Sequence, residues 1–172
     1  MNPTYYSVVP SAIGPLTLRW SGGALTGVHF DDADALARRR EWVRDDACLE
    51  PVRTQIEEYF RGERRVFDLP LAFQGTPFQE RVWRALVEIP FGTTTSYGEL
   101  ARRIGRPDWP GARAVGAANG QNPIAVIVPC HRVIGADGSL TGYAGGLPRK
   151  SWLLAHEGVT NLRAHPLQTS LL

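Results

Sequence analysis

Two helix-start signals in the second half of the chain constrain its fold more than any other feature. The first is TPFQ at residues 76–79, which combines a capping threonine, a proline at the first helical position and a glutamine three residues after the cap. It predicts a helix over about residues 77 to 88. The second is SYGE at residues 96–99, which predicts a further helix that ends at Gly105.

A third segment completes a helix-turn-helix pattern. The loop RPDWP and the stretch GARAVGAANGQNP follow at residues 106–123, and two short helices joined by such a turn are typical of this motif. Helices that read base edges carry Arg, Lys, Asn or Gln, whereas this one offers only Arg113 before its last turn. Its other residues are small: Ala112, Ala114, Gly116, Ala117 and Ala118. The segment either approaches DNA closely with little sequence reading or packs against the neighbouring helix.

The first half of the chain has strand patterns. Residues 7–30 alternate around a Gly22-Gly23 turn, which predicts a β-hairpin. Residues 32–46 are charge-rich and predict a solvated helix or loop. Pro51 opens a predicted helix, and VFDLPLAF at residues 66–73 predicts a short strand that Pro70 interrupts.

These patterns predict an α/β (α+β) protein with two domains. Residues 1–75 would form a domain with a small antiparallel sheet and helices, and residues 76–172 a mostly helical domain with the helix-turn-helix and a short active-site strand. The first part carries a net charge of −2 and the second +4, which is compatible with a polyanionic partner or with a solvated surface. Residues 159–172 lack periodicity and are expected to be disordered.

Composition and cysteine usage indicate a soluble, reduced protein. The chain is 43% hydrophobic and 21% charged, which is ordinary for a globular protein. It has no apolar run near the ~20 residues that span a bilayer, and its N-terminus lacks a signal-peptide pattern. Its two cysteines, Cys48 and Cys130, do not form a disulfide framework. We therefore expect a cytoplasmic protein.

Cys130 lies between a proline and a histidine in VIVPCHRVI. The apolar run at residues 124–128 predicts a buried strand, after which Pro129 would hold the thiol rigidly. A free cysteine is mostly protonated at neutral pH, so it needs a base, and His131 is a candidate. Because adjacent side chains rarely point the same way, a water-bridged relay is favoured over direct contact.

Glu157 stands out in the predicted helix LPRKSWLLAHEG. It lies in the last turn, where the helix dipole disfavours a carboxylate by ~0.3–1 kcal/mol. Orientation or charging of His131 would explain its position. Exposure to solvent is the alternative.

Over roughly residues 76–158 the chain resembles the O6-alkylguanine-DNA alkyltransferases, or methylated-DNA–protein-cysteine methyltransferases. The resemblance lies in the order and spacing of SYGELA, ARAVG, NPIAVIVPCHRV, VPCHRVIG and TGYAGGLPRKSWLLAHEG. Residues 1–75 resemble the family's ribonuclease-H-like N-terminal domain more loosely, through GPLTL and the hairpin.

The resemblance implies roles around the thiol. Cys130 would accept the alkyl group, His131 would activate it through a water, and Glu157 would fix the imidazole. Asn122 would hydrogen-bond the backbone around the thiol. Tyr97 would lie in the guanine pocket and donate a proton or hydrogen bond to the leaving base.

It also implies a base pocket and a DNA-binding face. Val133 and Tyr143-Ala144-Gly145 would line the pocket and recognise a flipped base through backbone groups. Because some family members have serine where this chain has Ala144, a hydroxyl contact to O6 would be absent here. Arg113 would replace the extruded nucleotide. The implied DNA-binding residues are Thr95, Ser96, Tyr97, Gly98, Ala112, Arg113, Ala114 and Gly116.

The implied reaction is an irreversible transfer. A thiolate that attacks the alkyl carbon on guanine O6 leaves a thioether, which water cannot hydrolyse, so each molecule would act once. We expect no cofactor, and no metal either, because the first half has only Cys48 and His29 as soft ligands.

The expected partner is double-stranded DNA with O6-alkylguanine, bound with little sequence preference by a monomer and without a membrane. Cooperative binding along DNA, activity on O4-alkylthymine and the accepted alkyl size stay open. Two alternatives are a cysteine hydrolase and a non-catalytic sensor of alkylated DNA. The hydrolase would need a deacylation step, and the sensor would lack the nucleophile that Cys130 supplies.

Overall fold

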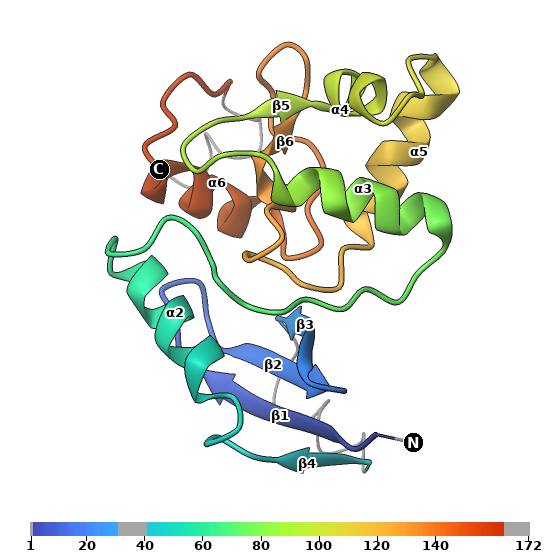
Figure 1. Cartoon of the computed structure of the whole chain (residues 1–172). Helices are drawn as coiled ribbons and strands as arrows, with labels where there is room; N and C mark the ends of the chain where they lie inside the picture. The colour runs from blue at the N-terminus through green and yellow to red at the C-terminus, as the bar shows by residue number, and fades with distance from the viewer. Residues whose placement is uncertain (1, 31–40, 164–172) are drawn as a thin grey trace. The chain divides into compact units, whose positions relative to one another are not determined.

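The computed structural model of the chain describes residues 2–30 and 41–163 (Figure 1). The chain divides into two compact units. The first runs to Gln74 and also includes Pro123–Ile127, and the second comprises Gly75–Asn122 and the chain from Val128 onward. The sequence patterns predicted a boundary near residue 75. They did not predict that Pro123–Ile127 belongs to the first unit.

The first unit contains a four-stranded sheet with the order β3-β2-β1-β4. Its strands are β1 (Thr4–Val9), β2 (Leu16–Ser21), β3 (Ala24–His29) and β4 (Trp42–Arg44). The predicted hairpin is confirmed, since β2 and β3 pair antiparallel around Gly22 and Gly23, whose φ angles are 60° and 81°. The prediction of an antiparallel sheet and of a loop or helix over residues 32–46 is wrong at β4, which pairs parallel to β1. Residues 31–40 lie outside the described chain.

Helix α2 (Glu50–Phe60) lies alongside this sheet and starts one residue before the predicted Pro51 (Figure 1). Val52, Ile56 and Tyr59 form its buried stripe. The periodicity of the apolar residues thus predicted both the helix and the side on which it packs.

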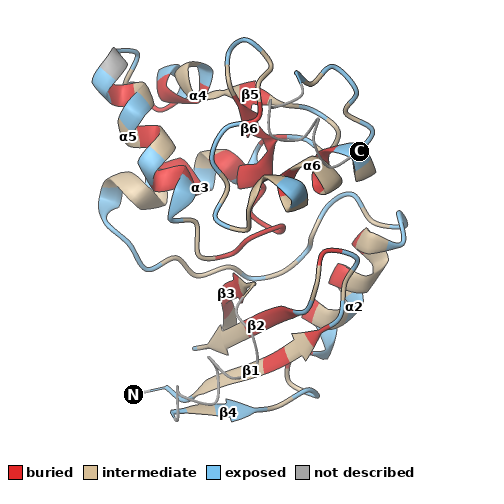
Figure 2. Cartoon of the chain, turned by 180° about the vertical axis from the view of Figure 1, so that it is seen from behind, coloured by how far each residue is buried: buried red, intermediate tan, exposed pale blue. Residues whose placement is uncertain are grey.

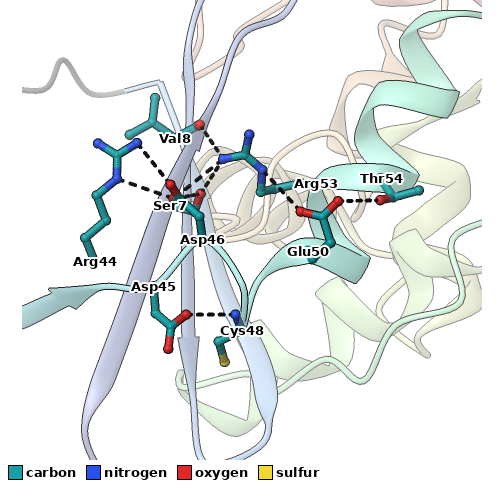
Figure 3. Close-up of polar contacts among 9 residues, drawn as sticks. All are labelled: Ser7, Val8, Arg44, Asp45, Asp46, Cys48, Glu50, Arg53 and Thr54. Carbon is teal, nitrogen blue, oxygen red and sulfur yellow. Dashed lines mark hydrogen bonds and ion pairs between the residues drawn. The ribbon is translucent and has the colours of Figure 1, made fainter.

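A polar cluster ties α2 to β1 in the first unit (Figure 3). Ser7 is fully buried, and its hydroxyl donates to Asp46 Oδ1 at 2.6 Å. Arg53 Nη1 donates to Ser7 Oγ at 2.8 Å and to the Val8 carbonyl at 3.1 Å. The buried hydroxyl is therefore satisfied as both donor and acceptor, which a polar group inside a sheet requires.

The strand predicted at residues 66–73 is wrong. Within it only Leu71 makes a bridge, to Leu25, with the Leu25 N–H donating to the Pro70 carbonyl at 2.9 Å. Pro70 has no N–H, so the ladder cannot continue through it.

The strand predicted at residues 124–128 is also wrong, although the run is buried. Ile124 makes one isolated bridge to Val28. The Ile127 N–H then donates to the Ala125 carbonyl at 2.8 Å around Val126, whose φ is +70°. This is a γ-turn, a strained conformation for a β-branched residue. Apolar content predicted burial correctly, but a run this short between two prolines does not specify a ladder.

The second unit is mostly helical. Its elements are α3 (Pro77–Val87), β5 (Thr95–Ser96), α4 (Tyr97–Arg103), α5 (Trp109–Gly120), η1 (Cys130–Arg132), β6 (Val133–Ile134) and α6 (Leu147–His156). Buried residues lie on the inner sides of the helices and in β5 and β6 (Figure 2). The mixed α and β architecture agrees with the predicted fold class.

Both predicted helix starts are confirmed. The Gln79 N–H donates to Thr76 Oγ1 at 3.1 Å, and the Thr76 N–H donates to Gln79 Oε1 at 2.9 Å. At the second signal the Glu99 N–H donates to Ser96 Oγ at 3.1 Å. These caps fix where α3 and α4 begin.

Helices α4 and α5 form the predicted helix-turn-helix. The expected loop RPDWP is shorter than predicted, because the Gly111 N–H donates to Asp108 Oδ1 at 2.6 Å and α5 begins at Trp109. On α5, Val115 and Ala118 are buried, whereas Arg113 and Ala117 are exposed. The helix therefore packs on one side and leaves Arg113 on the other.

The end of the described chain packs onto α6. Val159 and Leu162 cover a cluster of Ile134, Leu140 and Leu154, so the prediction of disorder is wrong for residues 159–163. Residues 164–172 lie outside the described chain. Among the described helices, none is both long and apolar enough to cross a membrane.

Candidate functional site

Two consecutive tight turns position Cys130 at the start of η1. Pro129 has φ −82° and ψ 62°, and the Cys130 N–H donates across it to the Val128 carbonyl at 2.8 Å. This inverse γ-turn uses the dihedral that the proline ring fixes. Asn122 donates to the same Val128 carbonyl at 2.8 Å and also hydrogen-bonds the thiol. The thiol is consequently held on a stiff backbone and is only 4% exposed.

His131 follows the thiol and contacts Glu157. The distance from His131 Nε2 to Glu157 Oε1 is 2.8 Å, and neither side chain is exposed. An ionised carboxylate only accepts hydrogen bonds, so Nε2 carries the proton. Burial lowers the pKa of His131, and Arg132 and Lys150 lower it further against the effect of Glu157. The imidazole is therefore neutral near pH 7, with its basic nitrogen at Nδ1.

The contacts of Arg132 explain why a carboxylate, Glu157, lies at the C-terminal end of α6. Its Nε donates to Oε2 and its Nη2 to Oε1, both at 2.9 Å. Burial would raise the pKa of Glu157, but the hydrogen bonds from His131 and Arg132 outweigh it and hold the pKa well below its usual range. The carboxylate is thus retained by a bidentate ion pair, and exposure to solvent does not explain it.

A backbone donor completes the contacts of this carboxylate. The Gly92 N–H donates to Glu157 Oε2 at 3.2 Å. Gly92 has φ 76°, and a Cβ there would lie 3.0 Å from the Glu157 carbonyl oxygen. The position requires glycine both for its conformation and for its close approach to α6.

A cavity of about 630 Å³ adjoins Tyr97 and α5. Its lining residues are Tyr97, Ala112, Arg113, Gly116, Gly120, Thr141, Gly142, Tyr143 and Ala144. Cys130 is not among the lining residues, but Lys150 Nζ donates both to the Val133 carbonyl, just after the thiol segment, and to the carbonyl of the lining residue Thr141, so the thiol segment lies next to the cavity wall. Small residues on α5 leave the space open, and a Cβ on Gly116 would lie 3.6 Å from the Tyr97 ring.

Strand pairing brings the first helix of the helix-turn-helix to the thiol segment. Thr95 pairs with Val133 and Ser96 with Ile134, in parallel. Tyr97 follows directly, and its hydroxyl donates to the Thr141 carbonyl at 3.3 Å. Burial raises the pKa of Tyr97, so the phenol keeps its proton.

The remaining predicted residues are not among those that line the cavity. Val133 is buried in β6, and the Gly145 carbonyl accepts from Arg149 at 3.0 Å. Gly98 lies in the first turn of α4, where Ser96 is the cap, and Ala114 is half-buried on α5. Thr95 is only 7% exposed, so its side chain is not part of a DNA-facing surface.

Burial raises the pKa of the Cys130 thiol, while the hydrogen bond from Asn122 and the charge of Lys150 act to lower it. The sequence reasoning did not identify Arg132, Gly92 or Lys150 as site residues. Arg132 follows His131 directly, but adjacency gave no reason to bury it. One feature of the sequence could have pointed to Lys150, which is the only lysine of the chain.

The described residues contain no cluster of three or more His, Cys, Asp or Glu side chains that could hold a metal. Cys48 lies before α2, with its backbone N–H donating to Asp45 Oδ1 at 2.9 Å (Figure 3). The groups around Cys130 that can take part in chemistry are its own buried thiol, the His131 imidazole and the Glu157 carboxylate.

Comparison with known families gives two matches that together cover most of the chain. Residues 77–159 match the family described as 6-O-methylguanine DNA methyltransferase, DNA binding domain. Residues 4–73 match 6-O-methylguanine DNA methyltransferase, ribonuclease-like domain.

Individual proteins agree with these matches. A methylated-DNA–protein-cysteine methyltransferase of Mycobacterium bovis is 50% identical over 153 residues, which is 89% of this chain and 92% of that protein. One of Methanosarcina acetivorans is 48% identical over 155 residues, covering 90% and 98% of the two chains.

Two solved structures are similar over most of their length. The O6-methylguanine methyltransferase of Mycobacterium tuberculosis has a TM-score of 0.83 and 47% identity, over 97% of this chain and 99% of that one. The structure of Mycobacterium tuberculosis OGT in complex with DNA has a TM-score of 0.82 and 50% identity, over 89% of this chain and 92% of that one.

Proposed function

Because the chain belongs to the family of 6-O-methylguanine DNA methyltransferases, we propose that it repairs O6-alkylguanine in double-stranded DNA by transferring the alkyl group to Cys130. One observation carries this proposal: the chain's buried thiol shares a site with an oriented imidazole and an open cavity beside a helix-turn-helix.

His131 acts as the base for the thiol. Its Nε2 proton is held by Glu157, and Nδ1 is a buried nitrogen with no hydrogen-bond partner among the described residues. A water between Nδ1 and the thiol would carry the proton from sulfur to the imidazole, as the sequence favoured over direct contact. The resulting imidazolium is stabilised by Glu157, which is ionised beforehand.

The cavity receives the flipped base. Its volume of about 630 Å³ and its glycine and alanine lining leave room for a purine with an alkyl substituent. Backbone groups of Tyr143, Ala144 and Gly145 would recognise the base, since Ala144 offers no hydroxyl. Tyr97 keeps its proton and would donate to the leaving purine as negative charge develops on it.

Arg113 takes the place of the extruded nucleotide. It is exposed at the rim of the cavity on the helix whose other residues are mostly small. The small residues Ala112, Ala114 and Gly116, together with the α4 cap Ser96 and Gly98 in the first turn of α4, would let the backbone approach DNA without reading base edges. This arrangement supports binding with little sequence preference.

The bonds that form and break make the reaction irreversible. The Cys130 sulfur attacks the alkyl carbon, the bond from that carbon to guanine O6 breaks, and the purine leaves with a proton restored to it. The product is a thioether, which has no carbonyl for water to attack. Each molecule therefore acts once, and no cofactor enters the reaction.

The other assignments follow from the same proposal. The first domain would comprise residues 1–75 and the second residues 76–172, acting as a cytoplasmic monomer on DNA. O4-alkylthymine presents a similar alkyl carbon on an exocyclic oxygen and is the second substrate to test. A sensor without chemistry is disfavoured because Cys130 and its proton acceptor are both present. A hydrolase would also need a deacylation step, and turnover on ester or amide substrates would reveal it.

The test is a stoichiometry experiment with a duplex that contains O6-methylguanine in excess over protein. We expect guanine to be restored in an amount equal to the protein and no more, and Cys130→Ser to restore none. Guanine formation that continues beyond the amount of protein would contradict single use. Restoration by Cys130→Ser would contradict the assignment of the acceptor.

A further inference from the structure

Lys150 is the only lysine among the nineteen Lys and Arg residues of the chain, and it is fully buried in α6. Lysine is among the residues least often found completely buried unless it is paired. It differs from arginine in being a compact point charge with three donors, which a narrow site can surround. The proposed alkyl transfer assigns it no step, so its charge needs a separate explanation.

Three backbone carbonyls surround the Lys150 ammonium. Its Nζ donates to the Val133 carbonyl at 2.6 Å, to that of Thr141 at 2.7 Å and to that of Gly142 at 3.5 Å. These acceptors are neutral, and no carboxylate of the described chain lies within ion-pair distance of Nζ. The contacts therefore satisfy the donors but leave the positive charge without a counter-charge.

Apart from Lys150, the buried charged groups near the thiol cancel one another. Arg132 and Glu157 form a bidentate ion pair, and His131 is neutral because burial lowers its pKa. Tyr97 and Tyr143 are neutral because burial raises the pKa of both phenols. Arg149 adds a further positive charge, but it is only half-buried and donates to the Gly145 carbonyl, so its charge is outside the buried set.

The buried part of the site consequently carries an excess of one positive charge while Cys130 is protonated. Ionisation of the thiol makes this part of the site neutral overall. The charge of Lys150 acts to lower the pKa of Cys130, and the charge of Cys130 acts to raise the pKa of Lys150. Burial opposes ionisation of the thiol, because it penalises any charge. An internal cation is the simplest way for a protein to offset that effect without solvent.

We propose that Lys150 is the counter-charge of the Cys130 thiolate, a positioning residue that acts through the thiol and does not contact the substrate. This deepens the proposed function and rests on it for its purpose, since a thiolate is what attacks the alkyl carbon. Its second effect is structural: the same ammonium joins the strand that follows Cys130 to residues 141 and 142 of the cavity wall.

The charge effect and a merely structural effect predict opposite shifts of the thiol pKa. If Lys150 supplies charge, its removal leaves burial unopposed, and the pKa of Cys130 rises. If Lys150 only holds backbone in place, its removal loosens the site, admits water and lets the pKa of Cys130 fall towards that of a free thiol. The sign of the shift therefore distinguishes the two.

The first test compares Lys150→Gln, which keeps a hydrogen-bond donor, with Lys150→Met, which keeps only the length of the side chain. The thiolate is followed by its ultraviolet absorbance during a pH titration without DNA, with the signal of Cys130→Ser subtracted to remove Cys48 and the tyrosines. We expect the pKa of Cys130 to rise in both variants by about 1 to 3 units, the range for one neighbouring charge. An unchanged or lower pKa in Lys150→Gln would overturn the proposal.

A second measurement needs no variant of Lys150 and so does not depend on how such variants fold. Isotope-labelled lysine gives a single side-chain nitrogen signal in this protein, because the chain has one lysine. Burial lowers the pKa of Lys150 to about 8, and the charge of Cys130 acts to raise it. Since coupling is reciprocal, nitrogen NMR should show a lower pKa of Lys150 in Cys130→Ser than in the unmodified protein. Equal values would overturn the proposal.

These outcomes separate the inference from the proposed function. If the unmodified protein accepts a methyl group from O6-methylguanine DNA but neither pKa shift occurs, the role of Lys150 is wrong and the transfer stands. If both shifts occur but no methyl group is accepted, the counter-charge stands and the proposed function is wrong.

Discussion

Two carboxylates, Asp46 in the first unit and Glu157 in the second, have similar partners in opposite surroundings. Asp46 accepts from the Ser7 hydroxyl and from Arg44, with its side chain 48% exposed (Figure 3). Glu157 accepts from His131 and Arg132, with its side chain fully buried. Water screens the first group, whereas the second depends entirely on its protein partners.

The comparison shows that burial decides which polar cluster can do chemistry. Hydrogen bonding lowers the pKa of both carboxylates, from Ser7 for Asp46 and, against burial, from His131 and Arg132 for Glu157. The exposed ion pair of Asp46 with Arg44 contributes little to stability, and the main role of Asp46 is to accept from the buried Ser7 hydroxyl. A buried one fixes the tautomer of a histidine, because the ionised Glu157 carboxylate can only accept and His131 Nε2 must therefore donate.

Removal of the buried carboxylate is expected to have the largest effect. Glu157→Gln leaves the Arg132 charge without its counter-charge and should cost about 3 to 5 kcal/mol of unfolding free energy. It should also strongly slow alkyl transfer, because a neutral amide no longer stabilises an imidazolium at His131. Urea unfolding of Glu157→Gln and Asp46→Asn measures the contrast. Similar losses of stability in the two variants would contradict it.

A glycine in each unit gives a matched pair of backbone tests. Gly92 and Gly23 have φ angles of 76° and 81°, so alanine at either position costs about 1 to 2 kcal/mol for the left-handed conformation. An alanine Cβ at Gly92 would also lie 3.0 Å from the Glu157 carbonyl, whereas at Gly23 it would meet nothing within 4 Å. Thermal unfolding should show a larger loss for Gly92→Ala. Equal losses would mean that the contact with α6 does not constrain this site.

An exposed arginine can matter when a ligand covers it. We expect Arg113→Ala to slow repair of duplex DNA at least about tenfold, or 1.4 kcal/mol, and to leave reaction with a free O6-alkylguanine base nearly unchanged. Arg102→Ala is the control, because Arg102 is also exposed, at 61%, but does not line the cavity. Single-turnover rates on both substrates decide the matter. If Arg113→Ala slows the reaction equally on duplex DNA and on the free base, Arg113 does not replace the extruded nucleotide.

Acidification should produce the smallest effect. Burial holds the pKa of His131 below the value of about 6.5 in an unfolded chain. The contribution of the neutral His131 imidazole to the free energy of unfolding is therefore fully present above about pH 6.5. It is lost as the pH falls, by at most about 1.4 kcal/mol per pH unit. Unfolding free energies between about pH 6.5 and 5.5 should fall less steeply in His131→Gln. An identical slope in both proteins would show that the imidazole is not held neutral by burial.

Local patterns predicted the parts of the fold that local interactions determine. The capping residues Thr76 and Ser96 begin helices where expected, and the Gly22-Gly23 hairpin forms. The pairing of β4 with β1 was not predictable, because it joins segments far apart in the chain through backbone groups that carry no sequence signal. The buried run before Pro129 was similarly ambiguous, since apolar content specifies burial and not the backbone path.

The site was predictable where a residue looked out of place. Glu157 at a helix C-terminus, and a cysteine between a proline and a histidine, each suggested chemistry. Arg132 gave no such warning, and Lys150 only that it is the sole lysine, because both resemble ordinary surface cations until a structure shows them buried. Their partners are backbone carbonyls and one carboxylate reached only through folding.

The most direct test of the account is intact-protein mass followed by peptide mapping, after the protein is mixed with an excess of duplex that contains O6-methylguanine. We expect a gain of one methylene per molecule, confined to the peptide that contains Cys130 and absent from the peptide that contains Cys48. An unchanged mass while the DNA remains bound would contradict the account, and it would mean that the buried thiol and its oriented histidine serve recognition without transfer.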